Sequence, residues 1–269
     1  MEKEKIYLAG AFSDWRDKII QSLPKFQFAD PRNNRQNAVA KLVEDDMNNA
    51  CQCPILFGCF PEGHARGTMT YAEIGASKVS GNYIIIVDEN KEKDGLIKEV
   101  ASEELNSLEE GIEFLRGKDY VFIPSKQIRV KKEKAKGLDI LLVGDTAKIE
   151  KLDVDGKGIE KRIKTIPAGK YWTSEKDFEE IDLMIVNFPR GARDKKAVFY
   201  MGICYTLDIP IIMVESNPIV YPPLGGLAKR VFVGPEREII LQDYLSQLDS
   251  IEIEKEAPVM YNLFKKYDS

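Results

Sequence analysis

One glutamate lies in a segment whose composition suits an active-site carboxylate. Residues 63–80 read GHARGTMTYAEIGASKVS, a loop with two glycines followed by helical spacing, between two apolar segments. In open α/β sheets, the loops that follow the carboxyl ends of strands bind ligands. Glu73 is then expected in the first turn of a helix, where the helix dipole stabilises an ionised carboxylate by about 0.3–1 kcal/mol. One interpretation of Glu73 is therefore an anionic nucleophile.

A second interpretation of Glu73 is structural. Thr70-Tyr71-Ala72-Glu73 has the spacing of a capping box, with Thr70 as the N-cap and Glu73 as the third helical residue. The stability of the helix would then explain the glutamate without any chemistry. Spacing alone leaves both interpretations open.

The cysteines raise the question of a metal site. The chain has four cysteines and a single histidine, and Cys51, Cys53, Cys59 and His64 would supply four zinc ligands. The segment CPILFGCF is an apolar strand, however, and an extended row of this kind does not converge on a tetrahedral centre. Buried structural thiols are favoured, with neither a metal nor another cofactor. The uneven placement also differs from a secreted disulfide framework.

The elements that must position Glu73 follow from the apolar pattern. Short apolar runs bounded by turn residues predict strands, and apolar residues at spacings of three and four predict helices. Alternation of the two predicts βαβ units and a parallel sheet. The predicted strands are 5–10, 26–29, 53–60 and 83–87, and the predicted helices are 13–23, 38–50, 70–81 and 102–115.

The plan partly recurs in the second half of the chain. ILLVG at 140–144 matches IYLAG, and IDLMIVNFP at 181–189 matches CPILFGCFP. Gly202 precedes IIMVESN by nine residues, as Gly75 precedes IIIVDEN. Three matches in the same order indicate a duplication. Asp155-Gly156 interrupts the repeat with the signature of a hairpin turn.

The fold class predicted is therefore α/β, with two tandem doubly wound, mainly parallel open-sheet halves of the Rossmann or flavodoxin type. The two domains are expected at residues 1–130 and 137–269. The lysine-rich segment 125–137 is expected to link them, with a charged edge strand as the alternative.

Composition limits the classes of partner and the compartment. The 269 residues are 43% hydrophobic and 31% charged, with a formal net charge of −5 and charges of both signs interspersed. A nucleic-acid partner is not expected from this balance. No run of 18 apolar residues and no signal-peptide pattern occurs, so we expect a soluble cytoplasmic protein with no membrane partner.

Several segments together resemble the nucleoside 2-deoxyribosyltransferase-like family. They are KIYLAGAF, the SDWRDKI helix, ADPR, and GTMTYAEIGAS before an apolar strand, between about residues 5 and 90. The resemblance implies a doubly wound α/β fold and a glutamate nucleophile that attacks the anomeric carbon of a sugar. Glu73 takes the position of that glutamate, and Tyr7 that of a tyrosine that hydrogen-bonds it. It also implies a homo-oligomer, because a neighbouring subunit usually completes the family's active site.

The sequence departs from the family pattern on the nucleobase side. Family members carry aspartates at two positions where this sequence has Cys53-Pro54 and Arg66. Thr70 must fill the place of the family threonine, because Gly67-Thr68 lies two residues too far from Glu73. The acid that protonates the leaving nucleobase must then come from Glu44-Asp45-Asp46, and Asp46 is the candidate. The alternative interpretation is that the three acids form a solvated face of a helix. In the second half, Asp182 keeps the strand-start aspartate, but Tyr200 replaces the glutamate, so that half is expected to be catalytically silent.

These residues predict cleavage or transfer at the N-glycosidic bond of a (deoxy)nucleoside or nucleotide. A covalent glycosyl-Glu73 intermediate is expected, with transferase and hydrolase differing only in the acceptor. Two alternatives remain: a non-catalytic nucleotide-binding or sensing module, and a phosphoribohydrolase-like reading of GHARGT, in which position 72 would have to be a glutamate but is Ala72. Arg66, Arg16 and Ser13 are expected on loops that could contact a 5′-phosphate. The candidate substrate-binding residues are Gly10, Phe12, Ser13, Trp15, Arg16, Asp30, Arg66 and Thr70.

Overall fold

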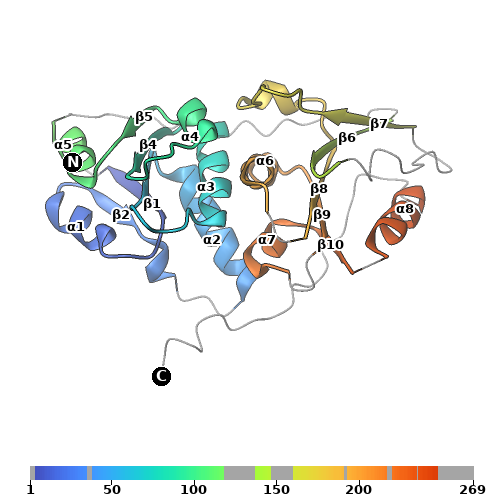
Figure 1. Ribbon diagram of the computed structural model, residues 1–269, viewed down its shortest axis with the longest axis horizontal. Helices are drawn as coiled ribbons and strands as arrows, with labels where there is room; N and C mark the ends of the chain where they lie inside the picture. The colour runs from blue at the N-terminus through green and yellow to red at the C-terminus, as the bar shows by residue number, and fades with distance from the viewer. Residues whose placement is uncertain are drawn as a thin grey trace.

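The computed structural model contains two parallel β-sheets, one in each half of the chain (Figure 1). It describes residues 4–34, 38–117, 137–146, 160–190, 193–216, 220–234 and 236–247. The first sheet has the order β2-β1-β3-β4-β5. Its strands are β1 (Lys5–Gly10), β2 (Gln27–Ala29), β3 (Ile55–Phe60), β4 (Tyr83–Asp88) and β5 (Glu103–Leu105).

The second sheet repeats the topology of the first. Its order, β10-β9-β8-β6-β7, is the order of the first sheet in reverse when β6 is matched with β1, and every neighbouring pair is parallel. The predicted fold class of two tandem open-sheet α/β halves is therefore confirmed. The strands are β6 (Gly137–Gly144), β7 (Glu160–Thr165), β8 (Leu183–Phe188), β9 (Ile211–Glu215) and β10 (Arg230–Val233).

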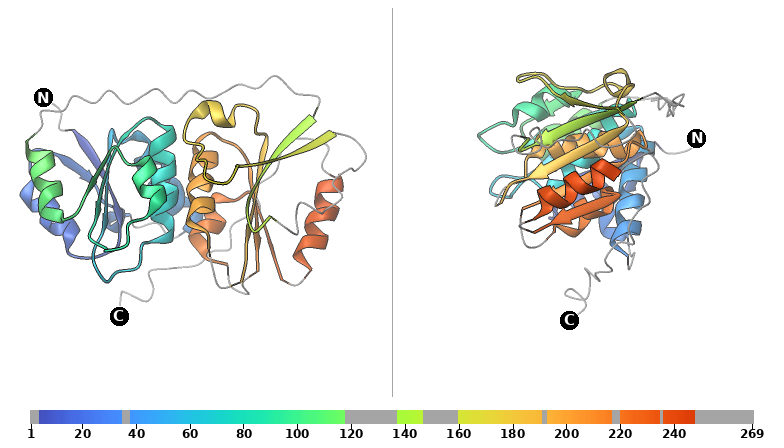
Figure 2. Two further views of the ribbon diagram at one scale, coloured as in Figure 1. Left: turned by 45° about the horizontal axis from the view of Figure 1, so that its top comes forward. Right: turned by 90° about the vertical axis from the view of Figure 1, so that its right-hand side faces the viewer.

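The helices form three layers around the two sheets (Figure 2). One core lies between the sheets and contains the apolar faces of α2, α3, α6 and α7, while separate cores lie under α1 and α5 on one side and under α8 on the other. The central layer thus covers the inner faces of both sheets. The helices are α1 (Trp15–Ser22), α2 (Val39–Gln52), α3 (Thr68–Val79), α4 (Gly95–Val100), α5 (Leu108–Arg116), α6 (Lys195–Thr206), α7 (Pro222–Leu227) and α8 (Arg237–Gln247), with 3₁₀ turns at Pro31–Asn33 and Glu175–Phe178.

Two predicted elements differ from the structure. Residues 102–115 were predicted as one helix but form β5 and then α5, because Ser107 caps α5 through a hydrogen bond from the amide of Glu110 and so ends the preceding segment. The first helix begins after Asp14 and not at Ser13. The expected hairpin at 155–156 lies outside the described residues, as does the expected linker apart from Gly137, which begins β6.

The two halves pack together through α3 and α6. A Cβ placed on Gly75 would lie 2.1 Å from the carbonyl oxygen of Phe199, and one on Gly202 would lie 2.0 Å from that of Ala72. The two contacts are reciprocal, because each glycine lies against the backbone of the other helix. The two helices are therefore related by an approximate local two-fold axis that exchanges Gly75 and Gly202. Glycine is required there because the backbones themselves are in contact.

An alanine at Gly75 should separate the halves or strain both helices. We expect Gly75→Ala to lower the free energy of unfolding by about 3 kcal/mol, against the gain in helix propensity that alanine normally brings. Gly95→Ala is the control, because its Cβ would meet no atom within 4 Å. Urea unfolding of both variants measures the difference. A Gly75→Ala protein with parental stability would show that the helices do not approach so closely.

Polar contacts also join the halves. Lys195 of α6 lies 3.3 Å from the carboxylate of Asp94, which accepts a hydrogen bond of 2.7 Å from the phenol of Tyr71. Cys51 and Thr206 form a further contact of 3.3 Å between Sγ and Oγ1. In the described part of the chain, no helix is long and apolar enough to cross a membrane.

Candidate active site

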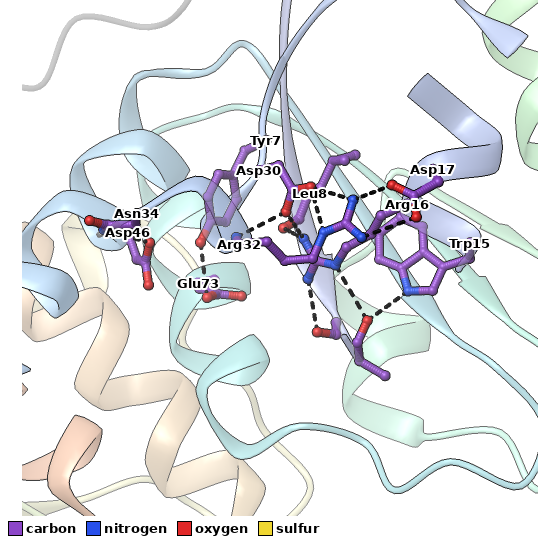
Figure 3. Close-up of polar contacts among 12 residues, drawn as sticks. Tyr7, Leu8, Trp15, Arg16, Asp17, Asp30, Arg32, Asn34, Asp46 and Glu73 are labelled. Atoms are coloured by element: carbon purple, nitrogen blue, oxygen red, sulfur yellow. Dashed lines mark hydrogen bonds and ion pairs between the residues drawn. The ribbon is translucent and has the colours of Figure 1, made fainter. Parts of the chain in front are cut away.

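Glu73 and Tyr7 meet in the interior of the first half. The phenol of Tyr7 donates a hydrogen bond of 2.9 Å to Oε1 of Glu73 (Figure 3). Tyr7 is in the centre of β1, fully buried, and Glu73 is 6% exposed. The structure therefore brings together the two residues that the sequence pairs as nucleophile and hydrogen-bond donor.

The position of Glu73 in α3 excludes the capping-box interpretation. The helix begins at Thr68 with Gly67 as its N-cap, so Glu73 is its sixth residue. A carboxylate there is too far along the helix to accept from the N-cap amide, and it lies beyond the first turn in which the dipole acts most strongly. The predictions of Thr70 as N-cap and of Glu73 in the first turn are both wrong, because the N-cap is Gly67, three residues earlier.

Asp46 shares the surroundings of Glu73. It lies on α2, is 9% exposed, and accepts a hydrogen bond of 3.3 Å from the side-chain amide of Asn34. Figure 3 shows Asp46 on the same side of Tyr7 as Glu73, with α2 and α3 next to each other. The neighbouring acids of the run differ from Asp46, since Glu44 is exposed and Asp45 is half-buried. The alternative of a solvated face thus applies to Glu44 and not to Asp46.

Burial raises the pKa values of both acids. Burial and then the charge of Asp46 raise the pKa of Glu73 to about 8, against the hydrogen bond from Tyr7 and the charge of Arg16. Burial likewise raises the pKa of Asp46 to about 7, opposed by the hydrogen bond from Asn34. Two buried carboxyl groups with overlapping pKa values titrate as a pair. Near neutral pH at least one of the two carboxyl groups therefore carries a proton.

Arg16 organises the loop beside this pair. It lies within α1 and not on a loop as expected, and it is 1% exposed. Its guanidinium donates to the carbonyl oxygens of Leu8, Gly10 and Ala11 and forms an ion pair of 3.0 Å with Asp30. A guanidinium with these partners fixes the end of β1 against the end of β2. Figure 3 shows this network, which continues through Arg32 to Asp17.

The other candidate residues lie around the same edge of the sheet. Gly10 has φ +125° and passes so close to β3 that a Cβ would lie 2.2 Å from the carbonyl oxygen of Cys59. Phe12 is 71% exposed next to Arg16, whereas Trp15 is buried and donates to the carbonyl of Ala11. The hydroxyl oxygen of Ser13 is buried without a hydrogen-bond partner among the described residues.

Thr70 and Arg66 flank the start of α3. Thr70 is buried in the first turn of the helix, one turn before Glu73. Arg66 is on the loop that precedes the helix, as expected, where it pairs with Asp88 at 2.7 Å and donates to the carbonyl of Glu92. Asp88 is the last residue of β4, so this pair holds the loop against the carboxyl edge of the sheet.

A cavity of about 500 Å³ opens next to Asp46. Its volume lies within the range of small-molecule sites. Asp46 and Asp30 line it, together with five side-chain amides that can both donate and accept hydrogen bonds. Tyr7 and Glu73 are not part of its wall, so Asp46 is the residue that the cavity and the buried pair share. The amides belong to Asn33, Asn34, Asn48, Asn49 and Gln52.

The cysteines form no metal site. Cys51, Cys53, Cys59 and Cys204 are buried free thiols, and His64 is exposed. Among the described residues, no three His, Cys, Asp or Glu side chains are arranged to hold a metal ion. Zinc, the disfavoured alternative, does not fit these side chains.

The equivalent positions of the second half are used for packing. Tyr200 is buried on α6, and its phenol oxygen accepts a hydrogen bond of 3.2 Å from the amide of Trp172. Asp182 accepts one of 2.9 Å from the amide of Asp139. Both side chains thus stabilise the fold of their own half.

Two residues next to the site were not found in the sequence. The side-chain amide of Asn34 donates a hydrogen bond to Asp46. Burial, and then the charge of Glu73, raise the pKa of the Tyr221 phenol. Each lies in a segment without periodicity, and Tyr221 comes from the other half of the chain. A local motif could not have identified either one.

Removal of the Tyr7 hydroxyl tests the electrostatics of the pair. Tyr7→Phe should raise the pKa of Glu73, because the hydrogen bond that favours the carboxylate is lost, and should lower kcat/KM about tenfold to a hundredfold for any substrate used. The rising limb of the pH profile should move to higher pH. Tyr83→Phe is the control, because it removes a phenol–carboxylate hydrogen bond to Glu103 away from the site. Equal kinetics in the two variants would contradict the role given to Tyr7.

Comparison with solved structures finds only low similarity, as three of them illustrate. The chain is similar to a 2-deoxyribosyltransferase of Bacillus psychrosaccharolyticus, with 19% identity and a TM-score of 0.37 over 45% of this chain and 98% of that one. It is similar to the CMP N-glycosidase of Clostridium botulinum, with 17% identity and a TM-score of 0.32 over 42% and 98%. The catalytic subunit of the Mycobacterium tuberculosis cobaltochelatase gives 13% identity and a TM-score of 0.28 over 81% and 22%.

Similarity at this level assigns no activity to the chain. No family model and no curated protein matches the sequence. The chemistry must therefore be inferred from the residues of the site themselves.

Proposed function

We propose that the first half cleaves or transfers at the N-glycosidic bond of a (deoxy)nucleoside or nucleotide, with Glu73 as the nucleophile and Asp46 as the acid. The observation that supports this most is that two buried acids, Glu73 and Asp46, lie in the same interior, with Asp46 also in the wall of the cavity. Such a pair supplies a nucleophile and a proton donor at once. Tyr7 supports the ionised form of Glu73 by its hydrogen bond to Oε1.

The reaction balances with these two groups. Oε2 of ionised Glu73 attacks the anomeric carbon, the C–N bond breaks, and its electron pair leaves with the base, which receives the proton of Asp46. A glycosyl ester of Glu73 remains. Water or a second base then attacks the anomeric carbon, Asp46 takes up the proton of that acceptor, and Glu73 leaves as a carboxylate. Water as acceptor makes the protein a hydrolase, and a base makes it a transferase.

The cavity beside Asp46 suits the leaving base. Its amides offer donors and acceptors for the edges of a heterocycle, and Asp46 itself lies in the wall. Arg16 acts indirectly, because it holds the loop that follows β1. Phe12, Ser13 and Arg66 lie at the edge of the sheet where the rest of the nucleoside would extend.

The alternative function, a nucleotide-binding or sensing module, is favoured by one observation. The pKa of Glu73, raised to about 8, leaves most of the glutamate protonated and weakly nucleophilic at neutral pH. Tight binding of a nucleotide without turnover between pH 6 and pH 9 is the expected behaviour of such a module.

Incubation with a substrate panel separates the two functions. The panel contains deoxynucleosides, ribonucleosides and their 5′-monophosphates, each with and without a free base, and chromatography separates the products. Free sugar indicates a hydrolase and a new nucleoside a transferase. Binding by calorimetry without product would replace the catalytic proposal with the sensing module.

A further inference from the structure

A second cavity, of about 310 Å³, lies between the two halves. Its wall combines residues of α2 with residues of the second half, from the end of α6, the start of β9 and the segment that follows α7. Figure 1 shows α2 and α7 side by side at this boundary. Asp46 and Glu73 are not among the residues that line it. The volume lies at the lower end of the range of small-molecule sites, so the cavity has room for a small ligand.

Part of the wall of this second cavity is apolar and buried. Four of the lining side chains belong to the core that lies between the two sheets, and they are Met47, Ile209, Ile211 and Leu227. Contact with these side chains removes apolar surface of a ligand from water, which favours binding. The wall therefore suits a ligand with an apolar group.

The same wall carries two side chains of opposite charge. Asp208 is exposed and Lys229 is half-buried. Among the described residues, neither forms an ion pair with any other side chain or with the other member of the pair. Glu44, the remaining charged side chain of the wall, pairs with Lys41 at 3.3 Å. The cavity thus offers one carboxylate and one ammonium group that are free to bind opposite charges of a ligand.

The internal repeat indicates that the turn itself does not require Asp208. Asp208 has φ +58°, and the equivalent residue of the first half is Gly81, with φ +73°. In both turns the amide of this residue donates to the carbonyl three residues earlier, from Asp208 to Tyr205 and from Gly81 to Lys78. Glycine is the usual residue in this conformation, because a Cβ is disfavoured there. The aspartate therefore adds a charge to the cavity at a cost in backbone energy.

We propose that the second cavity binds a free α-amino acid with an apolar side chain. The ammonium group of the ligand lies against Asp208, its carboxylate against Lys229, and its side chain against the apolar part of the wall. A ligand with only one of the two charges would leave Asp208 or Lys229 without a partner. This inference does not depend on the reaction proposed at Glu73, and it gives the boundary between the halves a binding role of its own.

Calorimetry with the wild type tests the class of ligand. At least one of L-leucine, L-methionine and L-phenylalanine should bind with a Kd below about 1 mM. The controls are the amine that lacks the carboxylate and the acid that lacks the amino group, which are isoamylamine and isocaproate for leucine. Each should bind at least about tenfold more weakly than the amino acid, because one charge-assisted hydrogen bond is lost. Absence of binding by all three amino acids, or equal affinity for the amine or the acid, would overturn the inference.

Two variants test the residues that bind the ligand. Asp208→Asn and Lys229→Met should each raise the Kd of the amino acid at least about tenfold. Asparagine tolerates the left-handed conformation, so Asp208→Asn should fold as the wild type does. Asp243→Asn is the matched control, because Asp243 is an exposed aspartate on α8 that does not line the cavity. A parental Kd in both charge variants would place the binding site elsewhere and overturn the inference.

NMR of the wild type locates the ligand without any substitution. With labelled isoleucine methyl groups, the signals of Ile209 and Ile211 should shift on addition of the amino acid, because both side chains line the cavity. The signal of Ile239, which is 69% exposed on α8, should stay in place. Binding that leaves the signals of Ile209 and Ile211 unchanged would contradict the assignment of this cavity.

Discussion

Glu73→Gln should lose turnover by at least about a thousandfold while the protein stays folded. The amide keeps an oxygen that can accept the hydrogen bond from Tyr7, but it is a far poorer nucleophile than a carboxylate. Steady-state assays give the loss in kcat, and thermal unfolding at pH 4, where the folded wild type and much of its unfolded chain hold the proton of Glu73, should show a melting temperature within about 2 °C of the wild type.

The pH dependence of stability provides an internal control for Glu73→Gln. Burial raises the folded pKa of Glu73 well above its unfolded value near 4, so the wild type keeps a proton that the unfolded chain releases. The stability that this proton provides is complete below about pH 4 and is lost as the pH rises through about 8. At pH 9 the glutamine variant should then be the more stable protein, by on the order of 5 kcal/mol. Parental turnover in the folded variant would show that Glu73 is not the nucleophile.

Asp46→Asn should remove the falling limb of the pH profile. In the wild type, kcat/KM should rise as the pair loses its first proton, near pH 7, and fall as it loses the second, near pH 8, because the reaction needs one carboxylate and one acid. Without Asp46 the pKa of Glu73 falls, since the neighbouring charge that raises it is gone. The rate should then be about a hundredfold to a thousandfold lower, and constant above the pKa of Glu73.

Asp45→Asn is the matched control for Asp46→Asn. Asp45 precedes Asp46 on α2 but is half-buried and pairs with Lys41 at 3.1 Å. Its loss should change kcat/KM less than threefold and leave both limbs of the profile in place. A profile of Asp46→Asn with two parental limbs would exclude Asp46 as the acid.

The fold could be predicted because the apolar pattern is strong. Runs such as YIIIV and ILLVG are long enough to mark buried strands, and the three ordered matches identified the repeat. Helix starts were less accurate, as the three-residue error in the N-cap of α3 shows, because Gly67 and Thr70 both suit an N-cap. That error produced the capping-box alternative, which the structure excludes.

Site residues could be predicted only where a local sequence motif contains them. Glu73 and Tyr7 were found because each is in a segment with a recognisable pattern, and their hydrogen bond joins residues 66 positions apart. Asp46 was chosen from three adjacent acids, and only tertiary burial distinguishes it from Glu44 and Asp45. Arg16 was expected on a loop but lies in α1. Its ion pair with Asp30 could not be inferred from the spacing of neighbouring residues.

Trapping of the glycosyl-enzyme tests the nucleophile most directly. A 2-fluoro-substituted nucleoside slows breakdown of the intermediate by withdrawing electrons from the anomeric centre, so the ester should accumulate. Mass spectrometry of the digested protein should find the added sugar on the peptide that spans residues 71–78, at Glu73, in the wild type and not in Glu73→Gln. An active wild type that forms no adduct, or an adduct on any other residue, would contradict the assignment of Glu73.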